Sequence, residues 1–324
     1  MKIFVTGGAG FIGSEFVRMA LNGKLSSVGI NPSKLIVYDA LTYAGNRNNL
    51  ESISTDARYE FIEGDICDLS IAKVIPKECD LLVNFAAESH VDRSISDSSI
   101  FIKTNVLGTQ NLLENSRNLG VKKFIQISTD EVYGSILSGS WDENFPLKPN
   151  SPYAASKASA DLIALSYART YGLPVVITRC SNNYGPFQNP EKLIPSFISK
   201  LITKRPVTLY GDGKNIREWI HVSDHVRAIA WLYRHGTSGE VYNIAGNEEK
   251  TNLEITKILL REFNEDDSMI QYVNDRPGHD LRYALNGSKI SKLGFKNEID
   301  FNNGLKSTVE WYRNNLNWLD MANS

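Results

Sequence analysis

The sequence predicts an α/β protein with a doubly wound parallel sheet, and three observations indicate this fold class. Short apolar, β-rich runs alternate with amphipathic segments along the first half of the chain. A glycine-rich turn directly follows the first of these runs. Polar and acidic residues stand immediately after several later runs, where the carboxyl ends of parallel strands would bring them to one edge of the sheet.

Length and composition indicate a globular chain with two units. At 324 residues the chain exceeds the usual size of a single hydrophobic core. A net charge of -2 gives no basic surface for nucleic acid and no polybasic membrane patch. Because the longest apolar runs are also far too short to span a bilayer, we expect neither a nucleic-acid partner nor a membrane one.

The cysteines favour a cytoplasmic protein without a metal site. Cys67, Cys79 and Cys180 are odd in number and lack the paired spacing of metal ligands, so reduced thiols are expected. No secretory signal is recognised, because Lys2 is followed at once by a strand-like run.

The glycine turn predicts a dinucleotide site of the Rossmann type. The apolar run 3–6 leads into Gly7, and Gly8, Gly10 and Gly13 have the G-x-G-x-x-G spacing before an amphipathic helix that ends near Leu21. Glycines at these positions allow a tight turn and a close approach of backbone N–H groups to a pyrophosphate at the helix N-terminus.

An acid at the end of the second apolar run favours NAD over NADP. Asp39 follows residues 35–38, where a carboxylate accepts hydrogen bonds from the adenosine ribose and repels a 2′-phosphate. Asp65, after the next run, could meet the adenine amino group or cap the following helix. Residues 98–119 are predicted as one long helix with Thr104 inside it.

The run 124–127 predicts a buried strand, and Ser128, Thr129, Asp130 and Glu131 follow it directly. An acid pair at this edge could do chemistry or could be solvated loop charge. Because consecutive strand residues point to opposite faces, both carboxylates reach one pocket only if the backbone leaves strand geometry here.

A helix predicted from Tyr153 to about residue 171 places Tyr153 and Lys157 on one face. A lysine ammonium beside a phenol is expected to lower the tyrosine pKa and so create a base for a hydroxyl proton. Core packing with a surface lysine is the alternative. With a nicotinamide cofactor, Tyr153 and either Thr129 or Ser128 could oxidise a secondary alcohol. Glu131 could then act as base and Asp130, with a raised pKa, as acid in an elimination.

The strand and helix alternation ends near residue 178. We expect an NAD-binding unit of residues 1–178 plus about 219–245, and a smaller, mostly helical unit of residues 179–218 plus about 246–324. Residues 139–152 form a loop that could cover the site. In the second half, Arg217, Arg276, His279 and Arg282 could bind a diphosphate, although each alone is more often a surface charge.

Eight motifs carry a resemblance to a known family. They are residues 6–14, DALTYAGN (39–46), AAESHVDRS (86–94), STDEVYG (128–134), SPYAASKA (151–158), RCSNNYGP (179–186), EKLIP (191–195) and RPGHDLRYA (276–284). With these motifs the chain resembles the extended short-chain dehydrogenase/reductases and, within them, the dTDP-glucose 4,6-dehydratase family along nearly its whole length. The Thr-Asp-Glu triplet is the specific feature, because related epimerases lack the acid pair.

The resemblance implies a redox-neutral cycle on a nucleotide sugar, with tightly bound NAD, C4 oxidation, loss of water across C5 and C6, and hydride return to C6. It implies a homodimer through the helices after residues 98 and 153. The implied cofactor contacts are Gly7, Gly10, Phe11, Ile12, Gly13, Asp39, Leu41, Thr42, Asp65, Ile66, Ala86, Ala87, Ser89, Thr104, Tyr153, Lys157 and Asn183. The implied substrate contacts are Ser89, Thr129, Asn182, Lys192, Leu193, Tyr210, Arg217, Asn252, Arg276 and His279. Leu281 departs from the motif, since many relatives have arginine there.

Two other readings remain open at this point. A sugar-nucleotide 4-epimerase would leave Asp130 and Glu131 without a chemical role. A non-catalytic dinucleotide-sensing protein would have no need of Thr129, Tyr153 and Lys157 together.

Overall fold

The structure, a computed structural model, describes residues 1–246, 248–275 and 279–323. Its centre is a seven-stranded parallel sheet with the order β10-β6-β5-β4-β1-β2-β3. The strands are β1 (Lys2–Thr6), β2 (Lys34–Asp39), β3 (Tyr59–Glu63), β4 (Leu81–Asn84), β5 (Phe124–Thr129), β6 (Val175–Cys180) and β10 (Glu240–Ile244). The order reverses between β1 and β4, the kind of switch point beside which ligands bind. The predicted fold class is confirmed.

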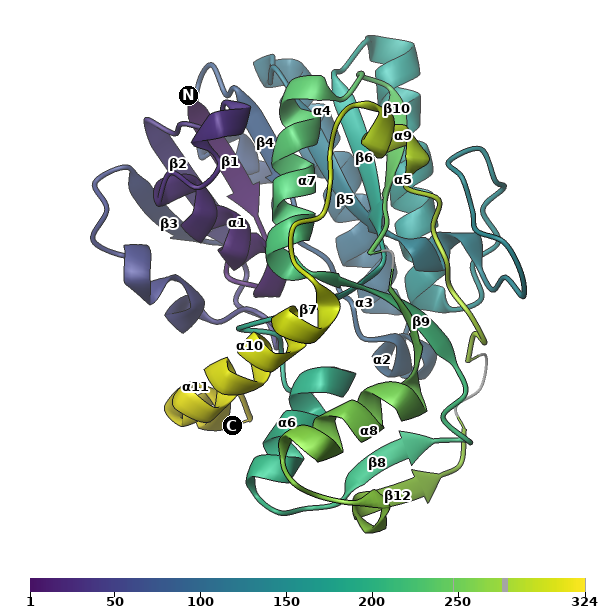
Figure 1. The fold of residues 1–324 in the computed structure, drawn as a ribbon. Coiled ribbons are helices and arrows are strands. Elements are labelled where there is room, and N and C mark those ends of the chain that lie inside the picture. Colours follow the sequence, from purple (N-terminus) through teal and green to yellow (C-terminus); the bar gives the residue numbers. More distant parts are fainter. Residues whose placement is uncertain (247, 276–278, 324) are drawn as a thin grey trace.

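Helices cover both faces of this sheet (Figure 1). Helices α1 (Phe11–Leu21) and α7 (Val222–His235) pack on one face, in a core that includes Phe16. Helices α4 (Thr109–Leu119) and α5 (Pro152–Tyr171) pack on the other. Because both faces are covered, the central strands are apolar on both sides, which is why they appear in the sequence as continuous runs.

The helix predicted over residues 98–119 is confirmed as one continuous helical stretch from Ser99 to Leu119, although it is not α-helical throughout. The structure has a short α3 (Ser99–Phe101), a π-helical segment (Ile102–Gly108, η4) and then α4. Strand β4 ends at Asn84, and the chain leaves the sheet before α2 (Val91–Ser96). Single-turn π segments inside helices are frequent at functional sites.

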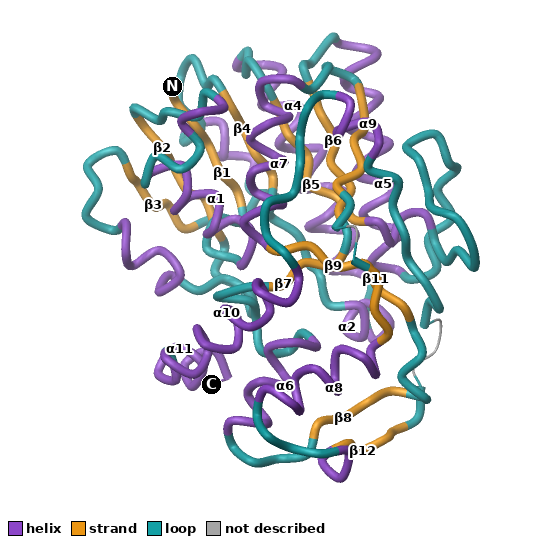
Figure 2. The backbone as a smooth tube through the Cα atoms, viewed as in Figure 1, coloured by secondary structure: helices purple, strands orange, loops and turns teal. Residues whose placement is uncertain are grey.

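Much of the second half of the chain forms a second core beyond the carboxyl edge of the sheet, whereas α9 (Ser288–Lys292) packs beside β10 of the large sheet. Trp219, Phe197, Ile255 and Tyr312 pack there. The remaining elements are β7 (Asn182–Tyr184), α6 (Leu193–Ile202), β8 (Val207–Tyr210), β9 (Ile216–His221), β11 (Glu249–Thr251), α8 (Asn252–Glu262), β12 (Ile270–Val273), α9 (Ser288–Lys292), α10 (Phe301–Asn314) and α11 (Leu316–Asn323), with short 3-10 turns at Ser26–Val28, Arg47–Ile53, Leu69–Lys73 and Asp267–Met269. Figure 2 shows the pair β8 and β12 at the end of the molecule away from the large sheet. The division into two units stays a prediction.

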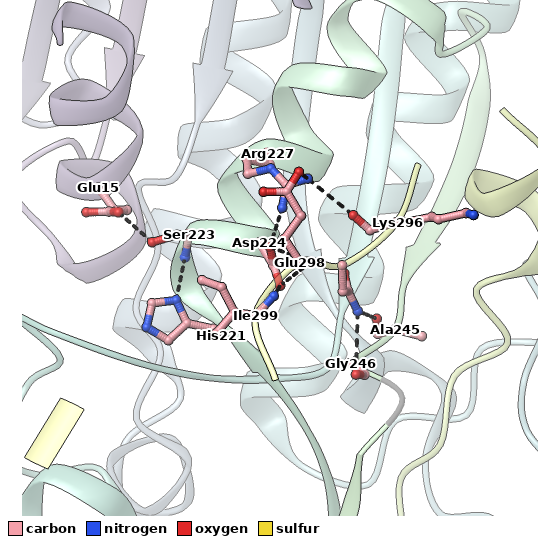
Figure 3. Close-up of polar contacts among 11 residues, drawn as sticks. Glu15, His221, Ser223, Asp224, Arg227, Ala245, Gly246, Lys296, Glu298 and Ile299 are labelled. Atoms are coloured by element: carbon pink, nitrogen blue, oxygen red, sulfur yellow. Dashed lines mark hydrogen bonds and ion pairs between the residues drawn. The ribbon is translucent and has the colours of Figure 1, made fainter. Parts of the chain in front are cut away.

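The first turn of α7 joins the two cores (Figure 3). Asp224 accepts hydrogen bonds from the backbone N–H groups of Glu298, at 3.0 Å, and Ile299, at 2.9 Å. Ser223 donates from its hydroxyl to Glu15 on α1 at 2.8 Å. The segment that leads into α10 is therefore held against the helices of the sheet.

Candidate active site

The chain leaves strand geometry at the acid pair. Strand β5 ends at Thr129, and Asp130–Tyr133 form a 3-10 turn (η5) whose first residues are both acids. The hydroxyl of Thr129 accepts a hydrogen bond from the backbone N–H of Glu131 at 3.3 Å and caps this turn. Because the backbone turns here, Asp130 and Glu131 line the same cavity.

We call this space, with a volume of about 260 Å³, the reaction cavity. It lies at the carboxyl ends of the central strands, where the sheet reverses its order. The residues predicted from the sequence that line it are Gly7, Gly10, Phe11, Ile12, Gly13, Ala87, Ser89, Ser128, Thr129, Asp130, Glu131, Tyr153, Lys157, Asn182, Asn183 and Lys192. Residues from six separate motifs thus meet in one place.

The surroundings of Asp130 favour the protonated form of its carboxyl group. Its side chain is buried, and burial raises its pKa well above the usual range, with the charges of Glu131 and Glu218 adding to the effect. Thr129 donates a hydrogen bond to one carboxyl oxygen at 3.2 Å. Among the described residues the other oxygen, Oδ2, has no hydrogen-bond partner. A neutral carboxylic acid beside a second carboxylate is the arrangement that divides acid and base roles.

The expectation that Lys157 lowers the pKa of Tyr153 is wrong when the groups of this chain alone are considered. Burial raises the pKa of Tyr153 well above its usual range, and Glu131, Cys180 and Asp130 raise it further. The Lys157 ammonium instead donates to the carbonyl oxygen of Ile127 on β5 at 2.6 Å, and burial lowers its own pKa. The i, i+4 spacing predicted a shared face correctly but not this electrostatic outcome.

The glycine turn forms a cradle with bare backbone. Gly7 has a φ of +67°, and a Cβ there would lie 2.4 Å from the backbone nitrogen of Ala86. A Cβ on Gly13 would lie 2.3 Å from the carbonyl oxygen of Gly7. Any side chain would therefore clash, and α1 begins directly behind the turn at Phe11. This local geometry fits the pyrophosphate of a dinucleotide.

Asp39 holds the loop that follows β2. Its two carboxylate oxygens accept hydrogen bonds from the backbone N–H groups of Ala9, at 2.8 Å, and Leu41, at 2.9 Å. Burial raises its pKa. Because each oxygen has a second lone pair, both can also accept from a ribose hydroxyl.

The other predicted contacts of the adenosine half lie outside the reaction cavity. These are Leu41, Thr42, Asp65, Ile66, Ala86 and Thr104. Asp65 accepts from the backbone N–H of Cys67 at 2.9 Å, and it is Asp68 that caps the next turn through Ser70. Asp65 therefore orders the loop after β3 rather than capping a helix.

Asn105 is a buried anchor that the sequence did not single out. It exchanges hydrogen bonds with the backbone N–H of Glu88, at 2.8 Å, and the Glu88 carbonyl oxygen, at 3.0 Å. Its amide also donates to the hydroxyl of Ser156 at 2.8 Å. The π-helical segment thereby fixes the loop that carries Ser89 against the helix that carries Tyr153 and Lys157. Its only sequence signal was a small polar residue inside a helical pattern.

Tyr43 is a second residue that sequence reasoning missed. It lines the reaction cavity, and its hydroxyl accepts from the backbone N–H of Ser89 at 3.2 Å. The guanidinium of Arg93 lies 3.9 Å from the centre of its ring. Its place inside the motif 39–46 was the available signal.

A larger cavity of about 560 Å³, which we call the substrate cavity, adjoins the first. Glu131, Asn182, Glu191 and Lys192 line both. The predicted substrate contacts that line the larger one are Asn182, Lys192, Leu193, Tyr210, Arg217, Asn252 and His279. Arg276 lies outside the described residues. The Oδ1 atom of Asn182 is buried and has no hydrogen-bond partner among the described residues, so it is available to a ligand.

Of the two described arginines expected at a diphosphate, Arg217 lines the substrate cavity and Arg282 does not. Arg217 is held by the carbonyl oxygen of Asp280 at 2.9 Å. Arg282 instead makes a two-bond pair with Glu249, at 2.7 Å each, and donates to the carbonyl oxygen of Gly139 at 2.8 Å. Arg282 therefore links the start of the loop 139–152 to Glu249 on β11. Leu281, next to it in the chain, is exposed.

Comparisons with known proteins show the family of the chain. The family model described as GDP-mannose 4,6 dehydratase matches residues 4–308. The dTDP-glucose 4,6-dehydratase of Streptomyces niveus is 50% identical, with 100% of this chain and 96% of that protein covered. The corresponding enzyme of an Actinoplanes species is 51% identical, with 98% of this chain and 99% of that protein covered.

Solved structures give the same assignment. The crystal structure of the dTDP-glucose 4,6-dehydratase from Streptomyces venezuelae, with NAD bound, has a TM-score of 0.97 and 53% identity, and covers 99% of this chain and 100% of that one. The chain therefore belongs to the GDP-mannose 4,6 dehydratase family of short-chain dehydrogenase/reductases, in which these similar relatives are dTDP-glucose 4,6-dehydratases.

Proposed function

We propose that this protein is an NAD-dependent dTDP-glucose 4,6-dehydratase, a hydro-lyase of deoxysugar biosynthesis that forms dTDP-4-keto-6-deoxyglucose. The observation that carries the proposal is the pair Asp130 and Glu131 in one cavity with Tyr153 and Lys157. A 4-epimerase needs no such pair, and a non-catalytic sensor needs none of the four.

The cofactor is NAD, as in the similar structures crystallised with it. Bound NAD would supply a hydride acceptor with a positively charged ring and, in its reduced form, a hydride donor. The bare backbone at Gly7, Gly10 and Gly13 would hold its pyrophosphate, and Asp39 its adenosine ribose.

Oxidation at C4 of the sugar uses Tyr153 as the proton acceptor. Thr129 hydrogen-bonds the reacting oxygen, since both residues line the reaction cavity. Because the charges of the chain oppose ionisation of Tyr153, proton transfer is expected to accompany oxidation rather than precede it. Lys157, whose ammonium is fixed by the carbonyl oxygen of Ile127, lines the same cavity as the phenol.

Elimination follows from the acidity of the C–H bond beside the new carbonyl group. Glu131, which lines both cavities, removes the C5 proton. Asp130, whose pKa is raised by burial and by the charge of Glu131, gives its proton to the departing C6 hydroxyl. The neutral and charged carboxyls thus have separate roles in one step.

The nucleotide would lie in the substrate cavity. Lys192 and Arg217 supply positive charge for the diphosphate, and Asn252 and His279 supply hydrogen bonds along the same wall. Ser89 and Asn182 border the space for the sugar.

We also propose a homodimer formed through α3, α4 and α5. The apolar side chains of Ile102 and Leu107, on η4 between α3 and α4, and of Leu162, on α5, are exposed, and α4 packs beside α5. Light scattering of the parent and of Leu107→Glu tests this, and a parent that is monomeric overturns it.

A cytoplasmic location is the simplest one for a chain whose Cys67, Cys79 and Cys180 are free thiols. No helix in the described part of the chain is long and apolar enough to cross a membrane.

The decisive experiment uses dTDP-glucose labelled with deuterium at C4. Loss of one water with the label at C6 is the expected outcome, measured by mass spectrometry and NMR. A product of unchanged mass would instead favour epimerisation, and complete absence of turnover would favour a sensor.

A further inference from the structure

One face of helix α6 forms a wall of the substrate cavity. Leu193, Ser196, Phe197 and Lys200 line it, and their spacing of three and four residues places them on one side of the helix. At the helical rise, Lys200 lies about 12 Å from Lys192 along this wall. Because Lys192 donates to the carbonyl oxygen of Ser89 at 2.9 Å, beside the reaction cavity, Lys200 marks the opposite end.

A pair of hydrogen-bond donors stands at that end. The ammonium of Lys200 donates to the hydroxyl of Thr208, on β8, at 2.7 Å, and both residues line the cavity. An ammonium has three donors, so two remain for other partners. The hydroxyl of Thr208 accepts the bond from Lys200 and keeps its own proton to donate. Partial burial also lowers the pKa of Lys200, because desolvation disfavours its charged form. A hydrogen-bond acceptor on a ligand would offset this cost of burying the ammonium charge.

The order of groups along the cavity assigns this end to the base, an argument that rests on the proposed function. If the sugar lies at Glu131 and the diphosphate at Lys192 and Arg217, the base reaches the end formed by α6 and β8. Phe197 and Leu209 are buried apolar side chains of the same wall.

We propose that Lys200 and Thr208 are specificity-determining residues that donate hydrogen bonds to the O4 carbonyl of a pyrimidine base. Thymine and uracil present an acceptor at this position, whereas cytosine presents an amino group, which is a donor. The amino group of cytosine would face the two donors Lys200 and Thr208 and find no acceptor. Cytosine is therefore disfavoured both by the missing hydrogen bond and by the cost of desolvating these polar groups. The apolar wall of Phe197 and Leu209 suits the flat ring.

The test measures the affinities of dTDP, UDP and CDP for the holoenzyme by calorimetry. The parent is expected to bind dTDP and UDP about tenfold or more tightly than CDP. Lys200→Met, which keeps the apolar stem but removes the donors, should weaken dTDP and UDP about tenfold and leave CDP unchanged. Thr208→Val should act in the same direction, with a smaller effect. With dTDP-glucose, KM should rise while kcat stays the same.

The matched control is Lys204→Met, four residues further along the chain. Lys204 has an exposed side chain that pairs with Glu265, and it does not line the substrate cavity, so no affinity should change. Thermal unfolding of each variant shows whether it is folded.

Two results would overturn the proposal. Equal weakening of all three nucleotides by Lys200→Met would place the ammonium at the diphosphate, and unchanged affinities would remove it from binding altogether. If the parent does not dehydrate dTDP-glucose but Lys200→Met still abolishes a preference for dTDP over CDP, the proposed function fails and the assignment of the base end stands.

Discussion

The ammonium of Lys157 donates to the carbonyl oxygen of Ile127 at 2.6 Å, and this bond joins helix α5 to the strand that ends in Thr129. The two residues lie 30 positions apart in the chain. The bond sets the distance between the element that carries Tyr153 and the element that carries the acid pair. The lysine is therefore a structural brace as well as a source of charge.

Lys157→Met should lose both functions. Without the ammonium the buried carbonyl of Ile127 has lost its donor, and the free energy of unfolding should fall by about 1–3 kcal/mol in urea titration. Product formation should fall about 100-fold or more. The control Lys34→Met removes a surface pair with Glu60 and should cost about 0–1 kcal/mol without affecting turnover. A Lys157 variant with the stability of the parent would show that the brace is not formed.

Glu131→Gln should stop the reaction at proton abstraction. The amide has the shape of the carboxylate but cannot accept the C5 proton, so water loss should fall about 10²–10⁴-fold. In D₂O, exchange at C5 should also disappear, as measured by mass spectrometry of recovered substrate and product. Glu310→Gln, on an exposed position of α10, is the control. If the Glu131 variant forms product at the parent rate, another group is the base.

The sequence predicted the sheet because its strands are apolar runs, and it predicted the acid pair because the acids directly follow residues 124–127. It could not predict that both carboxylates face one cavity. That depends on a 3-10 turn capped by the Thr129 hydroxyl, which is a matter of local backbone geometry. The predicted direction of the pKa shift of Tyr153 was wrong for a related reason. Burial and the nearby Glu131 raise this pKa, and both depend on how the folded chain places residues that are distant in sequence.

Asn105 illustrates the same limit. A polar residue in the middle of a helical pattern is usually a local backbone contact, and the sequence contains no sign of a π-helical segment. The segment matters because it aims the Asn105 amide at Glu88 and Ser156, which are distant in sequence. Residues whose role is to hold other residues are found from their contacts.

Asn105→Ala should therefore destabilise the protein through unpaired groups. Both backbone groups of Glu88 lose their partner in a buried setting, and about 2–4 kcal/mol of unfolding free energy should be lost in urea titration. Turnover should also fall, because Ser89 and α5 are no longer fixed together. Asn118→Ala, on the exposed side of α4, removes only a 3.2 Å contact with Glu114 and should change stability by about 0.5 kcal/mol or less. Equal losses in the two variants would argue against an anchoring role.

Asp130→Asn tests the raised pKa of the acid. The folded protein binds the Asp130 proton more tightly than the unfolded chain, in which the pKa is about 4. The favourable contribution of this group is therefore complete below about pH 4 and is lost as the pH rises toward the folded pKa. Asparagine stays neutral at every pH and shows no such loss.

The stability of Asp130→Asn relative to the parent should consequently increase from about pH 4 to neutral pH in urea titration. Water loss should fall about 10²–10⁴-fold, while exchange of the C5 proton in D₂O persists because Glu131 is intact. The control is Asp142→Asn, which keeps an oxygen to accept from the backbone N–H of Asn144 in a surface loop. A stability difference for Asp130→Asn that shrinks as the pH rises would mean that the carboxyl is ionised in the folded protein, and the proton for the departing hydroxyl would then have to come from another group.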